Sequence, residues 1–340
     1  MIGYYAHHQG AGHVQRAGQV ARRVSGPITV LSSADPGPGV PWLRLGRDDV
    51  PAPGPQDDVT AHSALHWAPL RHQGFRRRMA TLGRWLDDEA ADLLVSDVSV
   101  EVLALARLLS VPSVAVAMRG DRLDAPHALG YDLASHIVAP WPESTQQPWP
   151  PQWLERTTWV GPISRHDARA VVRTRCETGG RCVLLLLGRG GDAMRRTDLV
   201  EAAGVPDTHW HVAGDLTGNR PAGRPATLDL VGWLDDPWPY LCQADVVVAT
   251  AGNNAIADAA AARKPLVAVP QPRPFGEQES HARTLVSHGL AVLAEPWPDR
   301  RAWPDLLDQA MRLGGAGWAR YHDGGGAQRM ATALEEWSRA

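Results

Sequence analysis

The sequence has almost no lysine, few cysteines and no long apolar run, and these absences narrow the class of protein. No stretch approaches the ~20 consecutive apolar residues of a membrane-spanning helix. The first residues show no cationic segment followed by a long apolar one, so no secretory signal peptide is evident. The three cysteines, Cys176, Cys182 and Cys242, show no metal-ligand spacing, and we expect a protein of the reduced cytoplasm.

Length and charge set further bounds. The net charge of −3 gives no indication of a nucleic-acid partner. Arginine carries nearly all of the positive charge, which together with many Ala, Pro and Trp suggests a GC-rich genome and says little about function. The 340 residues suggest two domains, and the sequence shows no internal repeat.

The C-terminal half is organised around residues 245–282. An apolar run at 245–250 leads through the turn Ala251-Gly252-Asn253-Asn254 into an alanine-rich segment, and a second apolar run and a proline-broken loop follow. The pattern predicts strand, turn, helix, strand, loop and helix, with buried parallel strands. A helix that starts after such a turn presents backbone N–H groups that attract phosphate. An ordinary βαβ unit is the alternative, but two amides at the turn and an acid one helical turn later favour a ligand site.

This stretch resembles the donor-binding motif of the GT-B glycosyltransferases. It is most similar to family 28, which includes the bacterial lipid II-forming N-acetylglucosaminyltransferase, and also to the family 1 transferases of natural-product glycosylation. The resemblance implies that Gly252, Asn253 and Asn254 bind the donor diphosphate. It implies that Asp258 binds the ribose, and that Glu277 and Gln278 bind the donor sugar. The ribose acid is usually Glu in these families, so the shorter Asp258 departs from their pattern.

A glycine-bearing loop follows the first predicted strand, at residues 2–6, and ends in Gly12-His13 before a helix predicted over 14–24. The loop departs from the dinucleotide-binding pattern and resembles the first glycine loop of family 28, which faces the acceptor and the donor diphosphate. An inverting transfer needs a base for the acceptor hydroxyl, and a neutral imidazole suits this role. His13 is the predicted base, ahead of the two histidines that open the loop, and a capping or loop-bonding histidine is the alternative.

Asp97 ends a strand predicted over 92–97, and an acid at the carboxyl end of a parallel strand faces the ligand crevice. We expect Asp97 to orient His13 as the third member of a hydroxyl–His–Asp relay, with a helix N-cap as the alternative. The basic and apolar residues over 71–85 fit a solvated arginine face better than an interfacial patch for a lipid-linked acceptor.

Two further segments complete the predicted donor site. A buried strand at 182–187 ends at Gly188-Arg189-Gly190, which resembles the second glycine loop of the family; Arg189 either adds charge beside the leaving diphosphate or faces solvent. Trp233 and Leu234 stand where related enzymes pack a hydrophobic residue on the nucleotide base and read its edge through backbone groups. A core tryptophan is the alternative for Trp233.

The predicted fold is α/β, a GT-B arrangement of two Rossmann-like domains whose parallel sheets face each other across a cleft. Residues 1–162 form the acceptor-side domain, joined by a C-terminal helix at 326–340, and residues 163–325 form the donor-binding domain. The proline- and tryptophan-rich segment 141–153 is predicted to be a surface connection.

The predicted reaction moves a sugar from a UDP- or TDP-type donor to a hydroxyl acceptor, either a small molecule or a lipid-linked one. Inversion without a metal is expected, because the sequence has no Asp-x-Asp motif of the metal-dependent type. The expected location is the cytoplasm, with peripheral membrane contact left open. Two alternatives share the fold: a nucleotide-sugar 2-epimerase and a non-catalytic nucleotide-sugar binding protein.

Overall fold

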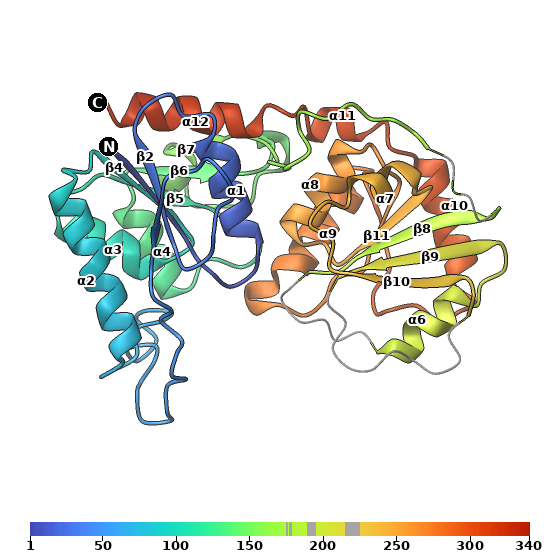
Figure 1. Cartoon of the computed structure of the whole chain (residues 1–340), viewed down its shortest axis with the longest axis horizontal. Helices are drawn as coiled ribbons and strands as arrows, with labels where there is room; N and C mark the ends of the chain where they lie inside the picture. The colour runs from blue at the N-terminus through green and yellow to red at the C-terminus, as the bar shows by residue number, and fades with distance from the viewer. Residues whose placement is uncertain (175, 177–178, 189–194, 215–224) are drawn as a thin grey trace. The chain divides into compact units, whose positions relative to one another are not determined.

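The computed structural model describes the chain except for residues 175, 177–178, 189–194 and 215–224. The chain divides into two compact units, Met1–Ile163 with Gly325–Ala340 (unit 1) and Ser164–Gly324 (unit 2). Each unit is a parallel sheet packed with helices (Figure 1), which confirms the predicted α/β class with two Rossmann-like units. None of the helices among the described residues is long and apolar enough to cross a membrane.

Unit 1 contains a seven-stranded sheet in the order β3-β2-β1-β4-β5-β6-β7, and every strand pair in it is parallel. Its strands are β1 Ile2–Ala6, β2 Ile28–Ser32, β3 Trp42–Arg44, β4 Leu93–Asp97, β5 Ser113–Val116, β6 His136–Ala139 and β7 Thr157–Trp159. The strand order reverses between β1 and β4, and the register pairs Ala6 with Asp97. The two strands therefore end together at a switch point, where doubly wound sheets bind their ligands.

The helices of unit 1 are α1 Gly12–Ala21, α2 Gln73–Asp88, α3 Val100–Leu108, α4 Ala125–Leu133, α5 Pro151–Leu154 and α12 Gly326–Trp337, with a 3-10 turn, η1, at Glu143–Thr145. In α12 the apolar residues Ala327, Met330, Ala331 and Leu334 recur at spacings of three and four, so one face packs on the sheet. A Cβ at Gly326 would clash with the carbonyl oxygen of Pro162, so this close approach requires glycine. The last helix thus completes the core of unit 1.

Two predictions about unit 1 were wrong in detail. The segment 141–153 is not a surface connection, because Trp141, Trp149 and Trp153 are buried and pack around Tyr131 against the sheet. The arginine-rich helix α2 is not entirely solvated either. Arg78 is buried, and its Nε lies 3.2 Å from Asp48, so one arginine of the segment belongs to the core.

Unit 2 contains a six-stranded parallel sheet in the order β10-β9-β8-β11-β12-β13. Its strands are β8 Arg181–Leu186, β9 Thr208–Ala213, β10 Leu228–Gly232, β11 Val246–Ala249, β12 Leu266–Ala268 and β13 Val292–Leu293. Its helices are α6 Arg196–Ala203, α7 Trp238–Gln243, α8 Asn253–Ala261, α9 Glu277–Ser287, α10 Trp303–Leu313 and α11 Trp318–Tyr321, with a 3-10 turn, η2, at Pro274–Gly276. The switch point of this sheet lies between β8 and β11.

Helix α8 follows β11 and is the alanine-rich segment that the sequence singles out. Ala259 and Ala260 have no exposed surface, and they pack with Val247 and Leu266 of the sheet. Small side chains let the helix approach the strands closely, which fixes where the helix begins at the carboxyl edge. Core packing of these alanines thus helps to position the start of α8.

Candidate active site residues

The structure brings His13 and Asp97 together at the switch point of unit 1. Helix α1 begins at Gly12, two residues earlier than predicted, so His13 lies in its first turn. Nδ1 of His13 lies 2.8 Å from Oδ1 of Asp97. Because a carboxylate only accepts, Nδ1 of His13 donates to it, and in the neutral imidazole Nε2 then keeps the lone pair. The side chain of His13 is 15% exposed, whereas that of Asp97 is fully buried.

Arg16 is a member of this cluster that the sequence analysis missed. Its Nε donates to Oδ2 of Asp97 at 2.7 Å, and its NH2 donates to Oδ1 at 2.6 Å, which makes the pair bidentate. The hydroxyl of Tyr4 donates to Oδ2 at 3.0 Å. The spacing of His13 and Arg16 could have indicated that Arg16 belongs to the cluster, because residues three apart on a helix lie on the same face.

Electrostatics keep Asp97 charged. Burial raises the pKa of this carboxyl, but the Arg16 guanidinium and, after it, the His13 imidazole outweigh burial and hold the pKa well below its usual range. A charged Asp97 fixes the ring orientation of His13 and stabilises an imidazolium there. The alternative role of Asp97 as a helix N-cap is excluded, because α3 is capped by Ser99, whose hydroxyl accepts from the N–H of Val102.

His7 and His8, the other histidines of the loop, have different surroundings. Burial lowers the pKa of His7 to about 3. Both ring nitrogens of His8 face acids, with Nδ1 lying 3.7 Å from Asp48 and Nε2 lying 3.4 Å from Asp49. Among the three loop histidines, His13 alone pairs with the buried acid at the end of β4.

The predicted diphosphate turn forms the start of α8. Gly252 is the N-cap residue, and the helix begins at Asn253 with no side-chain cap on its first turn. Ala251, just before it, has a φ of 63°, the left-handed region that a non-glycine residue adopts only under strain. A helix N-terminus at the carboxyl edge of a switch point has the dipole and the N–H groups that bind an anion.

Glu277 and Gln278 come to the same turn from the start of α9. Nδ2 of Asn253 lies 3.5 Å from Oε1 of Glu277. A Cβ at Gly252 would lie 3.9 Å from Nε2 of Gln278, and Oε1 of Gln278 accepts from the backbone N–H of Gln271 at 2.9 Å. The amide N–H2 of Gln278 is therefore presented beside the predicted diphosphate turn.

His281 fixes this arrangement and was not identified from the sequence. Its ring is buried in α9, with Nδ1 lying 3.0 Å from the carbonyl oxygen of Ala251 and Nε2 lying 2.9 Å from the hydroxyl of Tyr321. It lies one helical turn after Glu277, on the same side of the helix. His281 is thus a positioning residue that ties α9 to the strained turn before α8.

Asp258, the residue predicted to hold the ribose, is engaged by protein side chains. It is 5% exposed, the hydroxyl of Ser164 donates to its Oδ1 at 2.5 Å, and Nε of Arg165 lies 3.4 Å from its Oδ2. Burial raises the pKa of Asp258 to about 6. Both carboxylate oxygens are engaged by the segment that opens unit 2, which supplies Ser164 and Arg165.

The remaining donor predictions fall at the carboxyl ends of β8 and β10. Gly188 is exposed just after β8, whereas Arg189 and Gly190 lie outside the described residues. Trp233 and Leu234 follow β10 and are partly exposed, so Trp233 is not a core tryptophan. The indole Nε1 of Trp233 donates to Oδ1 of Asp235 at 3.1 Å.

Comparisons with known proteins relate part of the sequence to a glycosyltransferase family and the fold of the chain to solved structures. Residues 220–297 match the Glycosyltransferase family 28 C-terminal domain. The chain is 37% identical over 155 residues to the UDP-N-acetylglucosamine--N-acetylmuramyl-(pentapeptide) pyrophosphoryl-undecaprenol N-acetylglucosamine transferase of Nocardioides sp. (strain ATCC BAA-499 / JS614). This match covers 41% of the chain and 42% of the transferase, so the chain spans less than half the length of that curated relative.

Solved structures match almost the whole chain at low identity. The spinosyn rhamnosyltransferase SpnG complexed with thymidine diphosphate has a TM-score of 0.64 at 14% identity, and the match covers 98% of this chain and 100% of that one. A putative UDP-N-acetylglucosamine 2-epimerase from Listeria monocytogenes has a TM-score of 0.65 at 14% identity, covering 98% and 95%. These likenesses show the fold and do not by themselves separate the two activities.

The prediction of a GT-B fold with likeness to family 28 is confirmed by the two parallel α/β sheets and by the match over residues 220–297. The chain therefore has a GT-B fold, and its residues 220–297 match the glycosyltransferase family 28 C-terminal domain.

Proposed function

We propose that this protein is a glycosyltransferase that moves a sugar from a UDP- or TDP-type donor to a hydroxyl acceptor, with inversion and without a metal. The observation that carries the proposal is the His13–Asp97 pair, whose Nδ1–Oδ1 distance of 2.8 Å leaves Nε2 of His13 available to take a proton. The match of residues 220–297 to the family 28 C-terminal domain supports a nucleotide-sugar as the donor.

The proposed step is a direct displacement at the anomeric carbon. Nε2 of His13 takes the proton of the acceptor hydroxyl while the acceptor oxygen forms its bond to that carbon. The bond from the anomeric carbon to the diphosphate breaks, and the diphosphate leaves with the electron pair. Attack opposite the leaving group inverts the anomeric configuration. Asp97 stays ionised and stabilises the imidazolium that forms, as in other His–Asp pairs.

Residues of unit 2 are assigned to the donor. The start of α8, with Gly252, Asn253 and Asn254, binds the diphosphate through its N–H groups and dipole, which offset the developing charge. Gln278 and Glu277 bind the sugar hydroxyls. This assignment needs no cation, because helix-terminal N–H groups and amides supply the positive end of the interaction.

Trp233 and Leu234 are assigned to the nucleotide base, on which the partly exposed indole offers a flat apolar surface. Asp258 is left out of the donor set, because Ser164 and Arg165 already occupy its carboxylate. The acceptor is either a small molecule or a lipid-linked alcohol. The exposed arginines of α2 are assigned to solvent, which leaves the acceptor to be identified by assay.

The proposal is tested by incubating the full chain with UDP- and TDP-sugars, with and without a panel of hydroxyl acceptors. We expect release of the nucleoside diphosphate together with a product whose mass is that of the acceptor plus one sugar. The same donors without acceptor are analysed for an epimerised sugar. Epimer formation would replace the transferase with a 2-epimerase, and tight donor binding with no turnover for any acceptor would replace it with a binding protein.

A further inference from the structure

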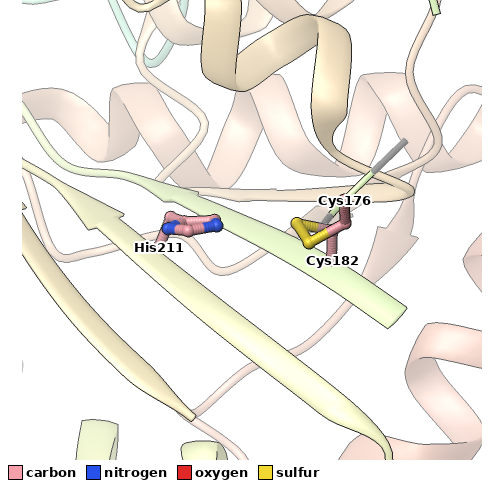
Figure 2. A group of neighbouring side chains, drawn as sticks. All are labelled: Cys176, Cys182 and His211. Atoms are coloured by element: carbon pink, nitrogen blue, oxygen red, sulfur yellow. A yellow bond between two sulfur atoms is a disulfide. The ribbon is translucent and has the colours of Figure 1, made fainter. Parts of the chain in front are cut away.

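We propose that Cys176, Cys182 and His211 form a binding site for a thiophilic divalent cation such as Zn²⁺ when the two cysteines are reduced. The three side chains meet in unit 2, and their potential ligand atoms all lie within 4.8 Å of one another. Figure 2 shows the two sulfur atoms bonded to each other, with one ring nitrogen of His211 turned toward them.

Adjacent strands position this cluster. Cys182 is the second residue of β8, and the register pairs it with His209 of β9, so His211, two residues further on, lies on the same face of the sheet. Cys176 comes from the segment just before β8. The cluster therefore lies toward the amino-terminal end of β8, whereas the donor turn follows the carboxyl end of β11, so the two are separate features of unit 2.

The ligand chemistry fits zinc. Two thiolates and one imidazole are typical zinc ligands, and the bond lengths of a tetrahedral site place the ligand atoms roughly 3.3–3.8 Å apart, which small side-chain shifts would reach from the observed spacing. A water molecule or a further side chain would complete the tetrahedron.

The surroundings of His211 provide an independent indication. Its Nδ1 is buried and makes no hydrogen bond with any described residue, although Oδ2 of Asp229 lies 3.6 Å away. The same carboxylate lies 2.8 Å from Nε2 of His209. A carboxylate behind a histidine is the arrangement that orients metal-binding imidazoles and raises their basicity. A buried ring nitrogen without a partner is costly, and a bound cation or a ring held by Asp229 would remove that cost.

Binding requires reduction first, because Cys176 and Cys182 are joined by a disulfide in this structure. A dithiol reductant supplies two electrons and two protons to the sulfur atoms and is itself oxidised to a disulfide. The cation then displaces the two thiol protons and binds the thiolates, so its uptake releases protons and depends on pH. Either state ties the segment before β8 to the sheet, by a covalent bond or through the cation.

The test measures Zn²⁺ binding by the full chain, reduced with excess dithiothreitol and then desalted without oxygen, in competition with a chromophoric chelator. We expect one Zn²⁺ per reduced chain and none per oxidised chain. Co²⁺ should give thiolate charge-transfer absorption in the reduced wild type. Cys176→Ser, Cys182→Ser and His211→Gln should each lose the competitive binding, and Asp229→Asn should weaken it by roughly 10–100-fold.

Cys242→Ser is the matched control, because Cys242 is the remaining thiol and lies outside the cluster. It should bind Zn²⁺ as the wild type does. Cys176 lies outside any helix or strand, so Cys176→Ser keeps the fold and its thermal midpoint verifies this. Absence of Zn²⁺ binding to the reduced wild type, or unchanged binding in Cys176→Ser, would overturn the proposal. Neither readout involves sugar transfer, so the result is independent of the proposed function.

Discussion

The six strands of the unit 2 sheet follow the same order as the first six strands of the unit 1 sheet, but the two switch points carry different side chains. In unit 1 the ends of β1 and β4 lie beside a charged cluster in which Arg16 and His13 both contact the buried Asp97. In unit 2 the end of β11, which lies beside β8 in the sheet, leads into a glycine and two uncharged amides at the start of α8. The two scaffolds thus present similar sheet edges, and the side chains at each edge are the basis for assigning proton transfer to one and anion binding to the other as proposals.

The two units also differ in the pKa of a buried aspartate. Asp97 faces a bidentate guanidinium and an imidazole, and its pKa is held below the usual range despite burial. Asp258 of unit 2 faces a serine hydroxyl and a more distant Arg165, and burial raises its pKa to about 6. Burial alone therefore does not set the charge of a carboxyl group; the number and distance of its cationic partners do.

The largest expected effect belongs to the proton-transfer residue of unit 1. His13→Ala should lower turnover by roughly 10²–10⁴-fold, the usual range for loss of a general base. Initial rates of nucleoside diphosphate release with a saturating acceptor measure this. His62→Ala is the control, because His62 is an exposed loop histidine of the same unit, and it should retain wild-type turnover. Equal turnover in the two variants would remove His13 from the chemistry.

The buried aspartates should respond to pH in opposite directions. Asp97→Asn leaves the buried Arg16 without its partner and should cost about 3–5 kcal/mol of stability, undiminished from pH 8 down to pH 5. The contribution of Asp97 is present above its unfolded pKa of about 4 and is lost only as pH falls below that value.

The contribution of Asp258 to stability changes with pH in the opposite direction, because its pKa is higher in the folded state than in the unfolded state. The stability of the wild type relative to Asp258→Asn should fall by roughly 1–3 kcal/mol as pH rises from about 4 to about 6, and then stay level. Thermal midpoints of both variants and the wild type, followed by tryptophan fluorescence across pH 4–8, measure the two trends. Parallel pH profiles for Asp97→Asn and Asp258→Asn would contradict the assigned environments.

A smaller effect is expected at Gln278 of unit 2, whose amide is proposed to bind the sugar. Gln278→Ala removes the N–H2 group beside Gly252, together with the oxygen that accepts from Gln271, and adds no charge beside the predicted diphosphate turn. Turnover should fall roughly tenfold, the cost of one lost hydrogen bond to a charged or polar partner, and discrimination between donor sugars should weaken. Affinity for the free nucleoside diphosphate should change less. Equal losses for the diphosphate and for the diphosphate-sugar would remove the sugar role.

The sequence predicted those features of the fold and site that depend on residues close together in the chain. Asp97 was placed at the end of a strand because an apolar run stops there, and β4 does end at Asp97. The helix after Gly252 was predicted from its alanines, although its start lies at Asn253, before Ala255. The family resemblance supplied the donor residues, of which Gly252, Asn253, Glu277 and Gln278 do lie close together.

What the sequence could not give depends on contacts between distant residues. Arg16 contacts Asp97 across 81 positions, and no local pattern reveals that pairing. Trp141 and its neighbours are flanked by prolines, which is typical of a loop, yet they fill the core beside Tyr131. Asp258 is the acid that the resemblance leads us to expect at this spacing. Its carboxylate contacts Ser164 and Arg165, which lie more than ninety positions away in the sequence, so no local pattern predicts these contacts.

We propose that the switch point of unit 1 carries the base and that the switch point of unit 2 binds the diphosphate. One titration tests this assignment most directly. Isothermal titration of a nucleoside diphosphate into the wild type, Asn254→Asp and His13→Ala compares both switch points with the same ligand. Asn254→Asp should keep the fold, since an acid is favourable in the first turn of a helix. It should nevertheless bind the diphosphate at least about tenfold more weakly, because it sets like charge beside the phosphates. His13→Ala should bind within about twofold of the wild type, as expected for a base that acts only on the acceptor. Unchanged binding in Asn254→Asp, or a large loss in His13→Ala, would contradict the account.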